Sequence, residues 1–310
     1  MATNHTPCGI EIPQVFFDGP VDMEHICRFV TKAETLGYDS LWLQERIIGE
    51  FTMLEPVSLL CYVAAITAKL RLGASVILLT LRNPLQLAKS YSTLDCMSDG
   101  RAVLGIGLGG GHLGSHEGIF GYSREKRVTR FTEAVEVMKL LWTESRASFH
   151  GTFWNFDDVS MEPKPIQKPH LPLWFGGHHE NALRRAVKHG NGWMGAGSSS
   201  ASAFVRESAI VRRFLDEAKR DPSTFGIAKR VYLAVDSDPN RAEQRIREWF
   251  GRRYKNADLG PKVCIWGSRE QCTEKIREIV RAGARHIVFN PMFDEMEHLE
   301  ICAKEIMPHL

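Results

Sequence analysis

The stretch Gly105-Ile106-Gly107-Leu108-Gly109-Gly110-Gly111 ends an apolar run that begins at Ala102. Near-continuous apolar runs of this kind are typical of strands that are buried on both faces. The glycines satisfy G-x-G-x-x-G, but a dinucleotide-binding turn of that type must open directly into a helix. Here helical periodicity resumes only near residue 123. The glycines therefore favour close approach of a cofactor ring or phosphate to the backbone, and tight packing remains the alternative.

Seven further apolar runs flank this one, and each of the eight is followed by an amphipathic stretch. Parallel βαβ units produce such alternation. Pro56 and Pro84 lie near expected helix starts, and Gly37, Gly190 and Gly283 follow expected helix ends. Eight units with right-handed crossovers close most economically into a (β/α)8 TIM barrel. We predict this α/β fold, with loop insertions, as a single domain over residues 1–310.

Two segments interrupt the predicted repeat. Residues 149–172 combine a short aromatic hairpin, His150 to Phe156, with a proline-rich run, and residues 254–264 form a Gly/Pro/Lys connection. We expect lids or interface elements, although a surface loop is an open alternative for the second. The predicted strands are Gly9–Pro13, Ser40–Leu43, Leu72–Leu79, Ala102–Leu108, Leu171–Phe175, Trp193–Ala196, Val231–Val235 and His286–Asn290. The predicted helices are Val21–Leu36, Pro56–Ala68, Pro84–Cys96, Arg127–Leu141, Asn181–His189, Phe204–Lys219, Arg241–Phe250 and Glu270–Ala282.

Composition narrows the class of protein. The chain has 310 residues, of which 39 are basic and 37 acidic, and it lacks a dense basic block interleaved with aromatic residues. This balance argues against a nucleic-acid partner. No apolar stretch reaches the ~18 residues that a membrane span needs, and no signal peptide is visible, so we expect no membrane partner and a cytoplasmic location. The seven scattered cysteines form no C-x-x-C pair and are expected to be reduced thiols.

Candidate catalytic residues follow from the rule that a barrel of this kind works at the carboxyl ends of its strands. Glu45 and Arg46 end the second strand, where a paired acid and base would serve as a general acid/base or substrate clamp. A structural salt bridge is the open alternative. His112 in the glycine-rich loop is the third candidate. It has i, i+4 spacing with His116, but the surrounding glycines argue against a helix, and we expect no metal site.

Gly176 and Gly177 follow the fifth strand and precede the helix predicted from Asn181. Backbone N–H groups and the helix dipole at such a place bind phosphate, with His178 as an additional donor. A plain Gly-Gly turn beside solvated histidines explains the same residues equally well. The residues alone leave both interpretations open.

An ordered set of motifs resembles the bacterial-luciferase-like oxidoreductases, which use FMN or the deazaflavin coenzyme F420. The set runs nearly end to end along the chain. It comprises Gly37-Tyr38-Asp39-Ser40-Leu41-Trp42, Leu72-Gly73 through Asn83-Pro84, Leu94-Asp95, Ser98-Asp99-Gly100-Arg101, Gly105-Ile106-Gly107-Leu108-Gly109, Pro163-Lys164-Pro165 with Gln167 and Pro169, Leu173-Trp174-Phe175-Gly176-Gly177, and Gly190-Asn191-Gly192-Trp193.

This resemblance implies roles for particular residues. Ser75-Val76 occupies the position where the family often carries a non-prolyl cis peptide behind the cofactor ring. The loop of Gly107, Leu108, Gly109 and Gly110 would flank the cofactor, and Gly176, Gly177 and His178 would contact its phosphate. Glu45-Arg46 stands where many deazaflavin-using relatives have Asp-His. Arg46 is a poor general acid, because the pKa of a guanidinium exceeds ~12.

Two further departures bear on the substrate and the cofactor. Gly110 replaces a Glu of the sugar-phosphate-oxidising relatives, and Leu108 replaces the phosphate-binding Arg of luciferase itself. The resulting hypothesis is hydride transfer between F420 and a small organic substrate, in a homodimer or higher homo-oligomer. The alternatives are an FMN-dependent monooxygenase and a flavin-binding member without catalytic activity. A metal-dependent barrel hydrolase is the least favoured.

Overall fold

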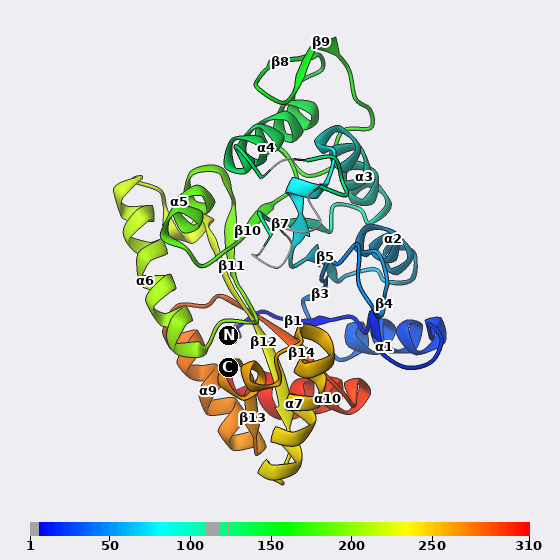
Figure 1. Cartoon of the computed structure of the whole chain (residues 1–310), viewed down its shortest axis with the longest axis vertical. Helices are drawn as coiled ribbons and strands as arrows, with labels where there is room; N and C mark the ends of the chain where they lie inside the picture. The colour runs from blue at the N-terminus through cyan, green and yellow to red at the C-terminus, as the bar shows by residue number, and fades with distance from the viewer. Residues whose placement is uncertain (1–5, 110–117, 123) are drawn as a thin grey trace, which may run out of the picture.

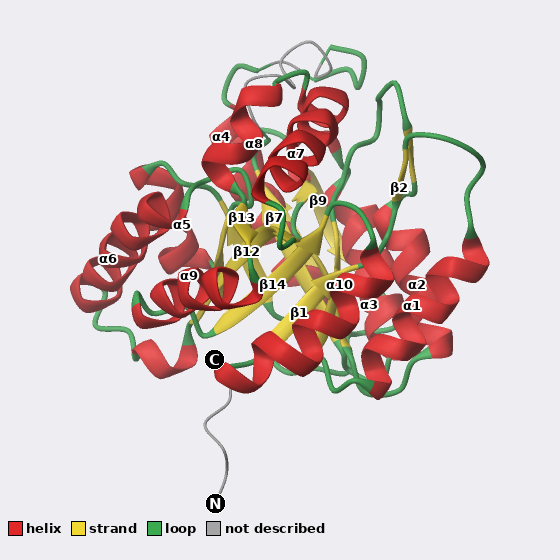
Figure 2. Cartoon of the chain, turned by 90° about the horizontal axis from the view of Figure 1, so that it is seen from below, coloured by secondary structure: helices red, strands yellow, loops and turns green. Residues whose placement is uncertain are grey.

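A computed structural model of the chain describes residues 6–109, 118–122 and 124–310 and shows a closed parallel barrel (Figure 1). Its eight strands run in the order β10-β11-β12-β14-β1-β3-β5-β7, and pairing of β10 with β7 closes the ring. The helices lie around the strands, as Figure 2 shows. The predicted (β/α)8 barrel is therefore confirmed.

The elements have the following bounds. The barrel strands are β1 (Cys8–Glu11), β3 (Ser40–Leu43), β5 (Arg71–Ala74), β7 (Ala102–Gly107), β10 (Leu173–Gly176), β11 (Gly192–Gly195), β12 (Gly226–Val235) and β14 (His286–Pro291). The shorter strands are β2 (Val15–Phe16), β4 (Thr52–Met53), β6 (Ile77–Leu78), β8 (Ala147–His150), β9 (Asn155–Val159) and β13 (Ile265–Gly267). The helices are α1 (Met23–Thr35), α2 (Pro56–Ile66), α3 (Pro84–Met97), α4 (Arg127–Thr143), α5 (Glu180–His189), α6 (Ala201–Glu217), α7 (Pro239–Tyr254), α8 (Gly260–Val263), α9 (Arg269–Arg281) and α10 (Glu295–Ile301).

The helix starts follow local sequence signals. Pro56 and Pro84 occupy the first turns of α2 and α3, where the missing N–H costs nothing. The side chain of Glu55 accepts a hydrogen bond from the N–H of Ser58, and Asn83 caps α3 in the same manner. These caps fix where the chain leaves the barrel mouth and turns back along its outside.

Two tryptophans fill the floor of the barrel, at the amino ends of the strands. Trp42 and Trp174 pack with their ring centroids 5.6 Å apart, in a cluster with Val103, Met194, Ala228 and Val288. Glycines make room for them: a Cβ on Gly226 would lie 2.7 Å from the Trp174 ring. The floor is thus closed by side chains, as is usual in such barrels, and leaves only the opposite end open.

The structure departs from the predicted boundaries mainly in β12, which begins at Gly226 rather than at Val231. The charges of Lys229 and Arg230 interrupt the apolar pattern, yet both side chains are buried. The aromatic hairpin is present as β8 and β9. Residues 257–263, expected as a connection, form a 3-10 turn followed by α8. None of the described helices has the length and apolar character that a membrane crossing requires.

Candidate functional site

A buried carboxylate organises the mouth of the barrel. Glu11 ends β1 and points toward the barrel axis, because alternate residues of a strand face the same side. Its oxygens accept hydrogen bonds from Gln44 Nε2 at 2.5 Å, Asn290 Nδ2 at 2.9 Å and Ser75 Oγ at 3.0 Å. Arg230 Nη1 lies 3.2 Å from the same carboxylate. Four strands therefore converge on one fully satisfied anion.

Arg230 is the cation of this network and is not among the residues predicted from the sequence. Its Nη1 also donates to the Ser75 carbonyl oxygen at 2.8 Å. Burial acts to lower the pKa of the guanidinium, but Glu11 and Tyr232 outweigh it, so the net pKa is raised and the cation is kept. Arg230 Nε has no hydrogen-bond partner in the part of the chain that the structure describes. The available signal was two cations inside an otherwise apolar segment, which indicates paired burial when the segment is a strand.

The Ser75–Val76 peptide bond is cis, as the resemblance implied. Val76 stands at the mouth among glycines: a Cβ on Gly107 would lie 2.7 Å from Val76 Cγ2, and one on Gly176 would lie 3.0 Å from Val76 Cγ1. Two of the glycines assigned to the cofactor, Gly107 and Gly176, thus lie against the side chain of Val76. Side chains larger than hydrogen at these glycines would fill the space beside Val76. The cradle fits a flat ring laid against Val76.

The rest of the β7 loop is described only in part. Leu108 and Gly109 directly follow β7 and are half-buried, and the Leu108 carbonyl oxygen accepts a hydrogen bond from Thr80 Oγ1 at 3.1 Å. Gly110 and His112 lie outside the described residues.

A second feature of the mouth is the turn from β10 into α5. Gly177 has φ +137°, a conformation that side-chain-bearing residues rarely adopt. Among the described residues no side chain caps the start of α5, and His178 and His179 are exposed beside it. The first backbone N–H groups of this helix therefore remain open to an anion. These donors fit the phosphate of a flavin-type cofactor.

Glu45 and Arg46 do not pair with each other, which corrects the arrangement considered for the acid/base pair. Glu45 is buried, accepts from Leu78 N at 2.5 Å and pairs with Arg82, whose Nε lies 2.9 Å away. Burial raises the pKa of Glu45, and Arg82 opposes that rise. Arg46 instead lies over the Phe51 ring and donates to a backbone carbonyl of α7. Consecutive residues of an extended chain point to opposite sides, which explains the separation.

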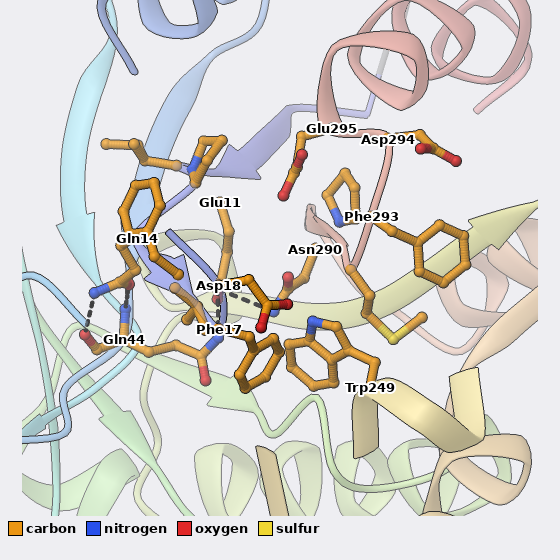
Figure 3. A pocket seen from close by; sticks show the side chains of 16 residues that line it. Glu11, Gln14, Phe17, Asp18, Gln44, Trp249, Asn290, Phe293, Asp294 and Glu295 are labelled. Carbon is orange, nitrogen blue, oxygen red and sulfur yellow. Dashed lines mark hydrogen bonds between the residues drawn. The ribbon is translucent and has the colours of Figure 1, made fainter. Parts of the chain in front are cut away.

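A pocket of about 350 Å³ opens beside the Glu11 network (Figure 3). Glu11, Gln44 and Asn290 belong to its lining, so the network forms part of its wall. Trp249 contributes from α7. The remaining lining residues are Ile12, Pro13, Gln14, Val15, Phe16, Phe17, Asp18, Pro291, Met292, Phe293, Asp294 and Glu295.

Comparison with known proteins gives this barrel and its mouth a family. Residues 11–286 match the family described as luciferase-like monooxygenase, and the chain belongs to that family. Among its curated relatives is an F420-dependent glucose-6-phosphate dehydrogenase of Kineococcus radiotolerans, 30% identical over 71% of this chain and 67% of that protein. A protein of the same name from Beutenbergia cavernae is 26% identical over 91% of this chain and 92% of its own length.

Solved structures show the same fold. An F420-dependent secondary alcohol dehydrogenase, in complex with an F420-acetone adduct, superposes with a TM-score of 0.85 at 20% identity, covering 98% of this chain and 99% of that one. A type II Baeyer-Villiger monooxygenase constituent from Pseudomonas putida, in complex with FMN, has a TM-score of 0.78 at 17% identity and covers 98% of each chain. The fold is therefore shared by proteins of both cofactor types.

Proposed function

We propose that the protein is an F420-dependent oxidoreductase that transfers a hydride between the deazaflavin and a small organic substrate. The observation that carries this is the glycine cradle around Val76 at the mouth, with an uncapped helix start nearby. The family membership and the relatives named as F420-dependent enzymes support it. Bound F420 would supply the two-electron hydride chemistry.

The described residues divide the binding of such a cofactor between them. Ser75, Val76, Gly107, Leu108 and Gly109 would hold the ring against the strand ends. The Glu11–Arg230 pair fixes Ser75 from below by hydrogen bonds to its hydroxyl and its carbonyl oxygen. This wall is preorganised, because both oxygens of Ser75 are already held in place before the cofactor arrives.

The phosphate would lie at the start of α5. Gly176, Gly177 and His178 would provide its contacts there, with open backbone N–H donors and the positive end of the helix dipole. Two separated anchors, one for the ring and one for the phosphate, set the orientation of the cofactor in the mouth.

For Glu45, Arg46 and His112, the three residues predicted to be catalytic, we propose roles other than cofactor binding. Glu45 is better suited to positioning than to proton transfer, because its carboxylate is occupied by Arg82 and by the N–H of Leu78, in β6 just after the cis peptide. Arg46 lies at the rim, where it can clamp a substrate. His112 is kept as a candidate proton donor.

Titration of the purified protein with F420 and with FMN, followed by fluorescence, tests the proposal. We expect F420 to bind more tightly and to be reduced or oxidised with a substrate. Tight FMN binding without F420 binding would overturn this preference. It would favour the second candidate, an FMN-dependent monooxygenase, which the likeness to the FMN-bound oxygenating structure keeps in view.

The homodimer expected from the family is likewise a proposal, as is a cytoplasmic location. A dimer is the commonest symmetric assembly of soluble proteins. Sedimentation velocity at micromolar concentration distinguishes a 35.0 kDa monomer from a dimer.

A further inference from the structure

The pocket beside Glu11 has an aromatic wall. Trp249 comes from α7 and Phe17 from the segment after β1 (Figure 3), and Phe16 of β2 also lines the pocket. The Trp249 and Phe17 rings lie 6.0 Å apart in an edge-to-face arrangement. Such a wall binds the flat apolar body of an organic molecule, and ring faces also attract cations.

Most of the carboxylates that line the pocket already have partners. Glu11 is held by Arg230, Asp18 by Arg252 and Asp294 by Arg245. These three pairs leave little net charge on their side of the wall.

Two acceptors remain open in the same lining. Asn290 is only 5% exposed, and the one side-chain hydrogen bond that it makes among the described residues uses Nδ2, which leaves its Oδ1 on the pocket wall free to accept from a ligand. The carboxylate of Glu295, at the start of α10, has one ion-pair partner among the described residues. This is the ring of His25, whose Nε2 lies 4.0 Å from Glu295 Oε2. Acceptors that face a pocket in this way can take hydrogen bonds from a donor group of a bound ligand.

We propose that this pocket is the substrate site and that it selects an organic cation, a protonated amine carried on an aromatic or other apolar body. The ammonium group would donate to Asn290 Oδ1 and to the Glu295 carboxylate, and the apolar body would lie on Trp249. None of the sixteen lining residues is a lysine, arginine or histidine. A phosphorylated substrate, as in the names of the curated relatives, would meet acceptors where it needs donors.

This inference rests on the proposed function only in taking the pocket as a substrate site, so its test omits the cofactor. The full chain is titrated calorimetrically at pH 7 with benzylamine, benzyl alcohol and benzyl phosphate, three probes that share one ring. We expect benzylammonium to bind about 5-fold more tightly than benzyl alcohol, as one weakly screened ion pair would give, and benzyl phosphate to bind most weakly. Equal or tighter binding of benzyl phosphate overturns the proposal.

Variants assign the effect to the pocket. Glu295→Gln is expected to weaken benzylammonium about 5-fold and to change benzyl alcohol less than about twofold, because only the charge is removed. Trp249→Ala should weaken both probes. Glu297→Gln, on the same helix but exposed and outside the pocket, is the matched control and should change neither. Equal loss of both probes in Glu295→Gln, or unchanged binding in Trp249→Ala, contradicts the assignment.

The outcome is separable from that of the cofactor proposal. If F420 fails to bind while benzylammonium still binds more tightly than the other two probes, the proposed function is wrong and the preference of the pocket for a cation stands. If F420 binds and the three probes show no preference for the cation, the reverse holds.

Discussion

The floor and the mouth of the barrel are built by the same strands and differ in almost every other respect. At the floor, Trp42 and Trp174 pack among apolar side chains, and the buried ring of His286 lies 2.9 Å from Ser40 Oγ. At the mouth, Glu11 and Arg230 form a buried ion pair within a hydrogen-bond network. Gln44, whose amide belongs to the network at the mouth, lies only two positions after Trp42, just past the end of β3. The interior of the barrel therefore changes from apolar packing to a charged hydrogen-bond network within one layer of side chains.

The largest difference between the two ends should appear when the charge pair is broken. Arg230→Met leaves the Glu11 carboxylate buried without its cation, and we expect the free energy of unfolding to fall by about 3–5 kcal/mol. Urea unfolding monitored by circular dichroism measures the change.

The control for this prediction removes both charges. Glu11→Gln/Arg230→Met should recover most of the lost stability, because no isolated charge remains. A double variant as unstable as Arg230→Met alone would show that packing, and not charge, is at stake.

The floor should respond to pH rather than to charge removal. Burial, followed by Arg71, lowers the pKa of His286 from 6.5 to about 3. The unfolded chain takes up a proton as the pH falls through 6.5, whereas the folded chain does not until about pH 3. Stability from this group is thus complete above pH 6.5 and declines by about 1.4 kcal/mol per pH unit below it.

His286→Gln should remove that dependence. Unfolding free energies of the two proteins at pH 6.5, 5.5 and 4.5 provide the test, and the gap between them should change by about 2–3 kcal/mol over the range. Parallel pH profiles would contradict the assignment of the slope to His286.

Overpacking the floor should cost stability without touching the site. Gly226→Ala places a methyl group 2.7 Å from Trp174 Cζ2, and we expect a loss of about 1–3 kcal/mol in the free energy of unfolding. The affinity for F420 should stay within twofold. Gly226→Ala/Trp174→Phe is expected to regain part of the loss, whereas a weakened cofactor affinity would mean that the two ends are coupled.

The smallest effect is expected at the rim. Gly177→Ala meets an unfavourable φ and should weaken F420 about 5-fold, equivalent to ~1 kcal/mol. Gly37→Ala is its match, since Gly37 has φ +82° but lies in the loop that enters β3 at the floor end. We expect comparable destabilisation in both and weaker cofactor binding only in Gly177→Ala. Fluorescence titration decides between them.

The sequence predicts the barrel well, because the two-sided burial of its strands leaves apolar runs. The same logic fails where buried residues are charged. Lys229 and Arg230 look like the end of a surface segment, and only the partners across the barrel reveal otherwise. Glu11, Gln44 and Asn290 lie at strand ends, so the rule that such a barrel works at the carboxyl ends of its strands points to them.

Pairing is harder to predict than position. Glu45 and Arg46 are neighbours in sequence, yet the ion pair forms with Arg82, which lies 37 residues away. Nothing in the local sequence pattern shows which distant cation will pair with a buried carboxylate such as Glu45. The cradle around Val76 could be predicted only through family resemblance, since no residue propensity signals that Gly107 and Gly176, on different strands, will face one valine.

Strand β12 places two buried cations side by side, one on each face. Lys229 donates from the outer face to the carbonyl oxygen of Ser199 at 2.7 Å, while Arg230 reaches Glu11 through the interior. A slip of one residue would exchange them, and Lys229 would then replace a guanidinium that binds Glu11 and Ser75 at once. The two buried cations thus fix the register of β12. Only one register gives both Lys229 and Arg230 their partners, and this protects the longest strand of the barrel from pairing out of register.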